Sequence, residues 1–338
     1  MLPFNDHVTG NRFEERKVPA SDNESRPDAS RMRQGFETQM PCPVCRSEKT
    51  YRVRVIDVEP VIELWRHFFE IDIKPEFRGF SQMELWSCVD CSVLFFAPQC
   101  LAGSAKMYAQ LASHGGYYVA RKWEYDAALS DLRGRQRILE VGCGSGSFMV
   151  LAKEEAGLPI EGVEQNSAAI SEAARRGLRV REATVEEAAK ESPGVYDAVC
   201  GFQVFEHIAR PKEFLDACCT LLRPGGLLIL GVPNQDSYVR HMLIPLDMPP
   251  HHMTRWTRKS LHRLQTHFPL KLARTACEPL GDNQIEHYVD TYFSLVWRGK
   301  FGFLLHPWLY SRAIRLIRYF RLQRFIRGQN IYACFVRS

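Results

Sequence analysis

Four cysteines near the start of the chain have the spacing of metal ligands. They form two pairs, Cys42-Pro-Val-Cys45 and Cys88-Val-Asp-Cys91, with 42 residues between the pairs. Four thiolates suit Zn²⁺ in tetrahedral geometry, and a closed shell of four sulfurs leaves no open position for chemistry. A redox pair and four unrelated thiols are the alternatives. We predict a structural zinc site, which would stabilise a module whose own core is too small to hold it together.

A glycine-rich turn follows a short apolar segment in the middle of the chain. Ile138-Leu-Glu-Val141, a predicted strand, leads into Gly142-Cys-Gly-Ser-Gly146 and then into a predicted helix over Phe148–Glu155. Glycine is needed where the backbone turns sharply and a ligand approaches it closely. Glu164, at the end of the next predicted strand, is placed to accept hydrogen bonds from a ribose diol. The order predicts a nucleoside site, and an ordinary strand-to-helix turn is the alternative.

The spacing within the turn bears on which nucleoside binds. A dinucleotide site has Gly-x-Gly-x-x-Gly, with the helix N-terminus facing a pyrophosphate. This chain has Gly-x-Gly-x-Gly, and Glu140 lies two residues before the first glycine. An acid at that position would repel a pyrophosphate but would pair with an amino group. S-adenosyl-L-methionine carries an ammonium, a sulfonium and no phosphate, so the pattern favours it.

Three segments in the order of the chain carry a family resemblance. Ile138–Phe148, Tyr196–Ile208 and Leu221–Asn234 resemble the signature motifs of class I S-adenosylmethionine-dependent methyltransferases. They are most similar to the branch with the ubiquinone-biosynthesis and bacterial sugar methyltransferases. Cys42–Pro98 resembles the zinc module that precedes some of these enzymes. The resemblance implies an α/β, Rossmann-like, seven-stranded methyltransferase sheet with an antiparallel last strand and helices on both faces, preceded by a small zinc-ribbon-like module.

The resemblance also implies which residues contact the cofactor. They are Glu140, Gly142, Cys143, Gly144, Gly146, Glu164, Gln165, Thr184 and Gln203. Where the family often has an acid near the adenine, this chain reads Glu182-Ala-Thr-Val-Glu186, so the contact is assigned to Thr184. Cys143 is expected to pack as a small side chain in the turn, because no family role requires its thiol. Removing the zinc is expected to unfold the cysteine module without directly removing cofactor binding.

Polar residues after the fourth and fifth predicted strands are expected to face the methyl acceptor, because open α/β sheets bind ligands at the carboxyl ends of their strands. His207 is the candidate general base, and shaping the pocket is its alternative role. The predicted lining of the acceptor site consists of Asn234, His251, His252 and Trp256. Capping the following helix and packing under Trp256 is the alternative for the two adjacent histidines. No metal site is expected from them.

Hydrophobic patterning divides the chain into five predicted regions. They are a disordered tail at 1–39, the zinc-binding module at 40–100, linking helices at 101–134, the methyltransferase domain at 135–280 and 329–338, and a basic aromatic insertion at 281–328. Within the domain, strands are predicted at 137–141, 160–164, 179–182, 195–202, 227–232, 270–276 and 331–336, with helices at 167–176 and 211–222. Ser167 is the predicted N-cap of the first of these helices, and Arg223–Gly226 is a predicted turn before the fifth strand.

Composition limits the class of protein. The chain has 338 residues, of which 45% are hydrophobic and 25% charged, as is typical of a soluble protein with a full core. It contains no apolar run long enough to span a membrane, and Met1–Gly10 has no apolar signal segment. Eleven cysteines then indicate a reducing compartment, and we expect a cytoplasmic protein.

Positive charge gathers at the end of the chain. Residues 291–338 hold nine Lys or Arg and no acid, so they carry +9, the first 290 residues carry −4, and the net charge is +5. An arginine recurs at every third position from Arg312 to Arg327. On a helix this spacing distributes the side chains around the axis instead of along one face. We favour a helix packed on the sheet, with arginine stems over apolar surface. Contact of 291–328 with the inner face of a membrane is the alternative.

These patterns together predict an enzyme. We expect methyl transfer by in-line displacement from the sulfonium to a small-molecule acceptor, namely a sugar, nucleotide-sugar or saccharide. One rival is a methyltransferase acting on a lipid or quinone at the membrane surface. The other is a non-catalytic nucleic-acid or protein binding module with a vestigial cofactor fold. Nucleic acid is not expected as a partner, because the cysteine pairs are the only recognisable candidate for a recognition module.

Overall fold

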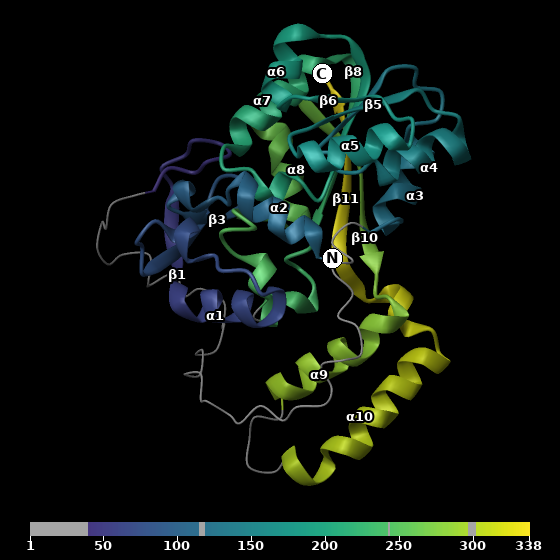
Figure 1. Cartoon of the computed structure of the whole chain (residues 1–338). Coiled ribbons are helices and arrows are strands. Elements are labelled where there is room, and N and C mark those ends of the chain that lie inside the picture. Colours follow the sequence, from purple (N-terminus) through teal and green to yellow (C-terminus); the bar gives the residue numbers. More distant parts are fainter. Residues whose placement is uncertain (1–39, 115–118, 243, 297–301) are drawn as a thin grey trace.

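The computed structural model describes residues 40–114, 119–242, 244–296 and 302–338. The predicted tail at 1–39 lies outside the described residues. Two sheets organise the described chain, one of seven strands and one of four (Figure 1).

The seven-stranded sheet confirms the predicted Rossmann-like fold. Its order is β10-β11-β8-β7-β4-β5-β6. The bounds are β4 Ile138–Val141, β5 Ile160–Glu164, β6 Val180–Glu182, β7 Tyr196–Phe202, β8 Leu222–Pro233, β10 Leu270–Pro279 and β11 Arg327–Arg337. β4 to β8 pair in parallel, whereas β11 is antiparallel to both of its neighbours. The carboxyl ends of β4, β5 and β7 therefore meet at one edge, where the predicted ligand residues lie.

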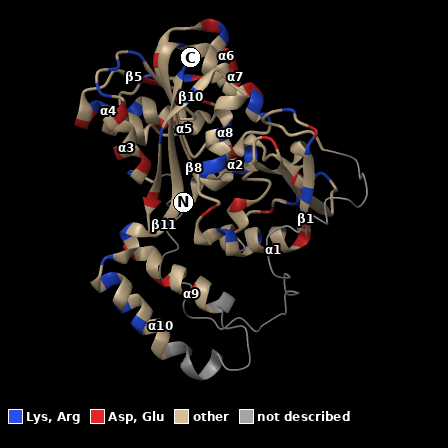
Figure 2. Ribbon diagram, turned by 180° about the vertical axis from the view of Figure 1, so that it is seen from behind, with Lys and Arg blue, Asp and Glu red and all other residues tan. Residues whose placement is uncertain are grey.

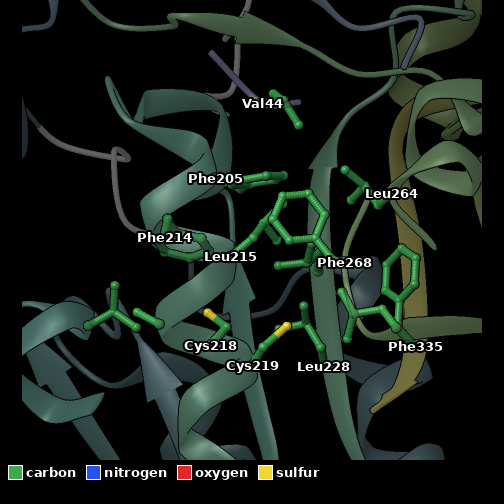
Figure 3. Close-up of a cluster of buried hydrophobic side chains, with 14 of the residues drawn as sticks. Val44, Phe205, Phe214, Leu215, Cys218, Cys219, Leu228, Leu264, Phe268 and Phe335 are labelled. Carbon is green, nitrogen blue, oxygen red and sulfur yellow. The ribbon is translucent and has the colours of Figure 1, made fainter. Parts of the chain in front are cut away.

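Helices cover both faces of this sheet. They are α3 Trp123–Asp131, α4 Ser147–Ala156, α5 Ser167–Arg175, α6 Val185–Glu191, α7 Pro211–Leu221 and α8 Arg258–Arg263. Successive strand residues point to opposite faces, so Ile138 joins the core under α3 and α4 while Leu139 joins the core under α6 and α7. Figure 3 shows the second core, with Phe214 and Leu215 of α7 facing Leu228 of β8.

Two local predictions in this domain differ from the structure. The N-cap of α5 is Asn166 and not Ser167, because the Asn166 side chain accepts the backbone N–H groups of Ala168 and Ala169. Residues 223–226 lie inside β8 instead of preceding it. The register against β7 jumps there, since Tyr196 pairs with Leu222 but Ala198 pairs with Leu227, so the predicted turn is a bulge.

The cysteine module is a second, smaller sheet. It contains β1 Thr50–Asp57, β2 Gln82–Cys88 and β3 Leu94–Ala97, with helix α1 Val58–Phe69 between the first two strands and α2 Ala105–Ser113 after the sheet. β2 and β3 are antiparallel neighbours, and the second cysteine pair forms the turn between them. The fourth strand, β9 Thr254–Arg255, comes from a distant part of the chain and pairs with β3.

The core of the module continues into the core of the large domain. Val44, Cys42 and Cys91 belong to the same buried cluster as Phe205 and Trp256. Figure 3 shows Val44 above Phe205, at the top of the core that α7 forms with the sheet. A second cluster joins α1 to the segment before β9, through Trp65, Met248 and Met253. The module therefore packs on the large domain through apolar side chains.

Helices α9 Ile285–Val296 and α10 Gly302–Tyr319 form the insertion, and they extend away from the sheet (Figure 1). α10 packs on α9 through a small cluster that includes Ile285, Val289 and Ile314, so the expected packing on the sheet is not the observed arrangement. Arg321 has a left-handed backbone (φ +51°) and follows the end of α10, so only part of the arginine repeat is helical. Figure 2 shows basic residues along α10. Among the described residues, no helix has the length and apolar character to cross a membrane.

Candidate active site

The glycine turn between β4 and α4 is fixed by its own backbone. Gly142, Gly144 and Gly146 have positive φ angles of 64°, 52° and 81°. A Cβ at Gly142 would lie 2.6 Å from Val204, and one at Gly146 would lie 2.1 Å from Leu178. Side chains at these two positions would therefore strain the backbone and displace the neighbouring packing.

Glu164 ties the turn to the end of β5. One carboxylate oxygen accepts the backbone N–H of Gly144 at 2.8 Å, and the other accepts those of Gln165 and Asn166 at 2.8 and 2.9 Å. Three donors thus hold the carboxylate in one orientation. Two carboxylate oxygens offer about four acceptor positions, so capacity is left for a ligand hydroxyl.

Glu140 is a buried acid at the end of β4. Its side chain is 3% exposed, and its Oε2 has no hydrogen-bond partner among the described residues. Burial raises the pKa of Glu140 well above its ordinary value, and the charge of Glu164 adds to that effect. A ligand ammonium would supply the missing partner and favour the ionised form. The residues at this edge therefore fit S-adenosyl-L-methionine, with Glu140 toward the amino group and Glu164 toward the ribose.

A surface pocket of about 500 Å³ lies beyond Glu164, at the carboxyl ends of β5 and β6. Its lining consists of Gln165, Glu182, Ala183, Thr184 and Glu187. Thr184 caps α6, because its hydroxyl accepts the N–H of Glu187 while the Glu187 carboxylate accepts the N–H of Thr184. Gln165 and Thr184 thus line one pocket as an adenine site requires, but the Thr184 hydroxyl already has a structural role.

Cys143 packs inside the turn. Its side chain is 6% exposed, and its Sγ lies 2.6 Å from where a Cβ on Gly162 would be. Burial raises the pKa of its thiol, with smaller contributions from Glu140 and Glu164. The thiol is therefore protonated at neutral pH, as a small packing residue would be.

Gln203 follows β7 in a left-handed conformation (φ +58°) and joins a chain of half-buried polar side chains that reaches the buried Glu124. Its amide donates to Glu124 of α3 at 3.0 Å and to Asn330 of β11 at 3.3 Å, and Asn330 donates to Glu278 at 2.9 Å. Burial raises the pKa of Glu278 to about 7. Glu124 is fully buried, and its Oε2 has no partner within the described part of the chain. Sequence reasoning missed Glu124, whose only signal is an acid in an otherwise apolar helix face.

Three histidines meet beyond the end of β7. One ring nitrogen from each of His207, His251 and His252 lies within 4.8 Å of the others. The centroid of the His207 ring lies 4.3 Å from that of His251 and 4.8 Å from that of His252. We call these three residues the histidine cluster. It begins close to the glycine turn, because Val204, which contacts Gly142, precedes His207 by three residues.

Each imidazole of the cluster is oriented by an oxygen. His207 Nδ1 lies 2.8 Å from the carbonyl of His251, and His251 Nδ1 lies 2.8 Å from the carbonyl of Leu246. His252 Nδ1 lies 3.2 Å from the carboxylate of Asp247, which also pairs with Arg255 at 3.0 Å. A carbonyl oxygen only accepts, so Nδ1 carries the hydrogen in the first two rings, and the ionised Asp247 imposes the same tautomer on His252.

Glu206 faces the histidine cluster from the same turn as His207. It is 1% exposed, and its Oε1 lies 3.8 Å from His207 Nε2 and 4.0 Å from His252 Nε2. Neither of its carboxylate oxygens has a hydrogen-bond partner among the residues described. Burial raises the pKa of Glu206 to about 8 and lowers the pKa of His207 to about 4. At neutral pH the His207 imidazole is therefore neutral, and it is a weak base.

Asn234 and Trp256 differ from the predicted acceptor lining. Asn234 is fully buried, donates to the carbonyl of Gly328 at 3.0 Å and accepts the N–H of Asp236 at 3.0 Å. The Trp256 ring stacks on Phe205 with centroids 4.4 Å apart, and its N–H donates to Thr254 at 2.9 Å. Both side chains thus serve the fold. The alternative of helix capping by the adjacent histidines also differs from the structure, since Thr257 caps α8.

The four cysteines come together as predicted. Their sulfurs all lie within 4.8 Å of one another, with Cys42 to Cys91 and Cys45 to Cys88 at 3.5 Å. The two pairs adopt the same local turn, because the N–H of Arg46 donates to the carbonyl of Cys42 and that of Ser92 to the carbonyl of Cys88. Bonds of about 2.3 Å to a central zinc would place tetrahedral sulfurs at comparable separations. The donor set therefore fits zinc.

Comparison with known proteins agrees with this geometry. Residues 112–273 match the family described as a methyltransferase domain. The chain is similar to the ubiquinone biosynthesis O-methyltransferase of Caulobacter sp. (strain K31), with 38% identity over 107 residues, 29% of this chain and 41% of that protein. It is also similar to the enzyme of that name from Paracidovorax citrulli, with 31% identity over 116 residues, 32% of this chain and 48% of that protein. The chain thus spans less than half the length of these relatives.

Solved structures of methyltransferases are also similar. One is a SAM-dependent methyltransferase from Archaeoglobus fulgidus, with a TM-score of 0.41 and 21% identity, covering 63% of this chain and 94% of that one. Another is the geranyl diphosphate C-methyltransferase from Streptomyces coelicolor A3(2), with a TM-score of 0.40 and 17% identity, covering 63% and 78%.

Proposed function

We propose that this chain, a class I S-adenosylmethionine-dependent methyltransferase by its domain match and motifs, methylates a small polar acceptor. The acceptor class is a sugar, nucleotide-sugar or saccharide. The observation that carries the proposal is the pair of acids at the glycine turn. Glu164 is held by three backbone donors, and Glu140 is buried with an oxygen that has no partner in the described chain.

The residues of this chain would mainly position the reactants. When bound, S-adenosyl-L-methionine supplies an electrophilic methyl group. Glu140 would hold the amino group of the cofactor and Glu164 its ribose. Orientation of two reactants alone is worth ~7–11 kcal/mol of the barrier. The site needs little covalent chemistry of its own.

Polar groups on the acceptor side favour a hydroxyl-rich acceptor. Glu206 and the histidine cluster present acceptor atoms, which pair with the donor hydrogens of a sugar better than with an apolar ring. His207 is the proposed proton acceptor, through Nε2, because its Nδ1 hydrogen is given to the carbonyl of His251. Its pKa of about 4 makes it a weak base, so the acceptor hydroxyl must itself be acidified.

Binding and turnover test this proposal separately. We expect the zinc-loaded chain to bind S-adenosylhomocysteine in isothermal titration calorimetry. With S-adenosylmethionine and a panel of nucleotide-sugars and saccharides, mass spectrometry should show one product heavier by a CH₂ unit. Absence of binding by the folded, zinc-loaded chain would reject the donor site. Binding with methylation only of non-sugar acceptors would reject the acceptor class alone.

A lipid or quinone acceptor at a membrane surface is the second candidate, and one surface favours it. Tyr319, Phe320 and Phe325, near the end of α10, are 81%, 60% and 79% exposed, and they alternate with arginines. Exposed aromatic and basic residues in one segment are typical of contact with an anionic membrane interface. The names of the curated relatives, ubiquinone biosynthesis O-methyltransferases, are in line with such an acceptor.

Flotation with vesicles distinguishes the two candidates. The membrane hypothesis predicts that the chain floats with vesicles containing anionic lipid, and that the double variant Phe320→Ser, Phe325→Ser does not. Phe80→Ser is the matched control, because Phe80 is 46% exposed on the cysteine module. Equal flotation of the double variant and the control would exclude a role for this surface.

A further inference from the structure

Glu206 and the histidine cluster form a buried group of acceptor atoms that the proposed methyl transfer does not fully use. The ring nitrogens of the three histidines lie within 4.8 Å of one another. Glu206 Oε1 adds a carboxylate oxygen, 3.8 and 4.0 Å from two of the Nε2 atoms. Ligands at bonds of about 2.0–2.2 Å from one tetrahedral ion lie about 3.3–3.6 Å apart, so small shifts of these side chains would bring them within reach of one ion.

The orientation of the rings is the one that metal-binding histidines have. The Nδ1 atoms of His207 and His251 face backbone carbonyls, and that of His252 faces the Asp247 carboxylate. Such outer partners fix the tautomer so that Nε2 carries the lone pair. Asp247 is itself held by Arg255, which donates to its Oδ2 at 3.0 Å and to its carbonyl at 2.9 Å. The chain thus supplies both the ligand atoms and the groups that orient them.

The unpartnered carboxyl of Glu206 also favours a cation at this place. Both oxygens of Glu206 are buried and have no hydrogen-bond partner among the described residues. A buried polar group without a partner is costly, and a buried carboxylate more so. The imidazole nitrogens that face Glu206 do not satisfy it, because at 3.8 and 4.0 Å they lie beyond hydrogen-bond distance. A divalent cation would satisfy the carboxylate and the imidazoles together.

We propose that His207, His251, His252 and Glu206 bind a divalent first-row transition metal ion, of which Zn²⁺ is the reference case. Imidazole with one carboxylate suits Zn²⁺, Fe²⁺, Ni²⁺ or Cu²⁺ better than Mg²⁺ or Ca²⁺, which prefer oxygen ligands alone. The site is separate from the four cysteines and differs from them in donor type. If the proposed function holds, the ion would lie on the acceptor side and acidify an acceptor hydroxyl, and His207 Nε2 would then be a ligand of the ion and not the proton acceptor.

The sequence prediction of no metal site at His251 and His252 considered only the part of the chain around that pair. Glu206 and His207 come from the turn after β7, whereas His251 and His252 precede β9, so the chain brings the ligands together from two segments. Tyr108 of α2 supports the arrangement, because its hydroxyl lies 3.2 Å from His207 Nδ1 and 3.0 Å from the carbonyl of His251.

Metal content of the full chain tests the proposal without any assay of methylation. After equilibration with Zn²⁺ and removal of free ion, we expect two zinc ions per chain, one at the cysteines and one at the histidine cluster. The double variant His251→Ala, His252→Ala should keep one. His267→Ala, an exposed histidine elsewhere, should keep two. Loss of ion by the control, or two ions in the double variant, would overturn the proposal.

A second measurement on the unaltered chain guards against a variant that fails to fold. With Co²⁺ in place of zinc, a mercurial reagent should release the thiolate-bound ion and abolish the sulfur-to-cobalt charge-transfer absorption. One cobalt per chain should stay bound, with only the weaker bands of nitrogen and oxygen ligands. Release of all cobalt by the mercurial would contradict the site. S-adenosylhomocysteine titration in the same samples shows whether the donor site stands independently.

Discussion

The proposed donor side and the proposed acceptor side of this site share one edge of a sheet but are built differently. The donor residues Glu140, Gly142–Gly146, Glu164 and Thr184 come from one continuous run of strands and helices. The acceptor side, Glu206 with the histidine cluster, joins two distant segments and rests on the cysteine module. Trp65 of α1 donates to the carbonyl of Pro245 at 3.3 Å and packs edge-on against His251. The first side is a property of the domain, and the second depends on the module.

This difference assigns a role to the cysteine module. Its sheet contains β9, which follows the histidine pair directly, and its core is shared with Phe205 and Trp256. Fixing the four cysteines with zinc would therefore also fix the segment that carries His251 and His252. We infer that a metal far from the reacting atoms shapes the acceptor side by packing alone.

The largest expected effect is that of removing zinc from the cysteines. Structural zinc contributes on the order of 10 kcal/mol to the folding of small modules. We expect Cys45→Ser with Cys88→Ser to raise hydrogen exchange in the module and at 244–256 far more than at 138–165. Cys100→Ser, an exposed cysteine outside the cluster, is the control. A uniform rise over both regions would show that the two sides are not separable.

Glu164→Ala should weaken binding at the donor side without affecting the acceptor side. The substitution leaves three backbone N–H groups without their acceptor and removes the proposed ribose contact. We expect affinity for S-adenosylhomocysteine to fall by about 3 kcal/mol, roughly a hundredfold, in calorimetry. Hydrogen exchange at 244–256 should not change. Glu154→Ala, on the exposed side of α4, provides the comparison, and equal affinities in the two variants would contradict the assignment.

The pH dependence of donor binding should report on Glu140. Burial raises its pKa, so the free chain keeps a proton there to a higher pH than an ordinary glutamate does. A ligand ammonium favours the ionised form and lowers the pKa in the complex, so binding releases a proton. Affinity should therefore rise with pH, by up to about tenfold per unit, until the pH exceeds the raised pKa. In Glu140→Gln the affinity should be flat with pH, and a slope that survives this substitution would point to another group.

Thr184→Ala should have the smallest effect. The hydroxyl caps α6 in a reciprocal arrangement with Glu187, and loss of such a cap costs about 1 kcal/mol of unfolding free energy. Urea unfolding should show this loss, and Thr184→Ser should restore it. Affinity for S-adenosylhomocysteine should change less than twofold. A large drop in affinity with unchanged stability would support the adenine contact that the sequence predicted for Thr184.

The fold and the glycine turn could be predicted from the sequence because their signals are local. Strand, glycine turn and helix follow one another at 138–156, and the acid at 164 ends the next strand, so short-range order is enough to place them. The antiparallel β11 followed from family resemblance. The four cysteines came from spacing alone, although the 42 residues between the pairs fold into a strand, a helix and most of a second strand.

Other features depend on contacts that no local pattern encodes. Nothing near His252 in the chain indicates that Glu206 lies against it, and nothing near Trp256 indicates that its ring stacks on Phe205. Arg321 has a left-handed backbone just after the end of α10. The regular spacing of the arginines gives no sign that the helix ends there. Long-range packing decides each of these cases.

The pairing of β9 with β3 sets an order of events during synthesis. The module's strands leave the ribosome early, but the edge of β3 acquires its partner only when Thr254 and Arg255 have emerged. Until then an unpaired edge is available to other chains. A nascent chain stalled between residues 98 and 253 should therefore be prone to self-association and to chaperone capture. A circular permutant that begins at residue 244 would have Thr254 and Arg255 in place before β3 emerges, and it would relieve that wait.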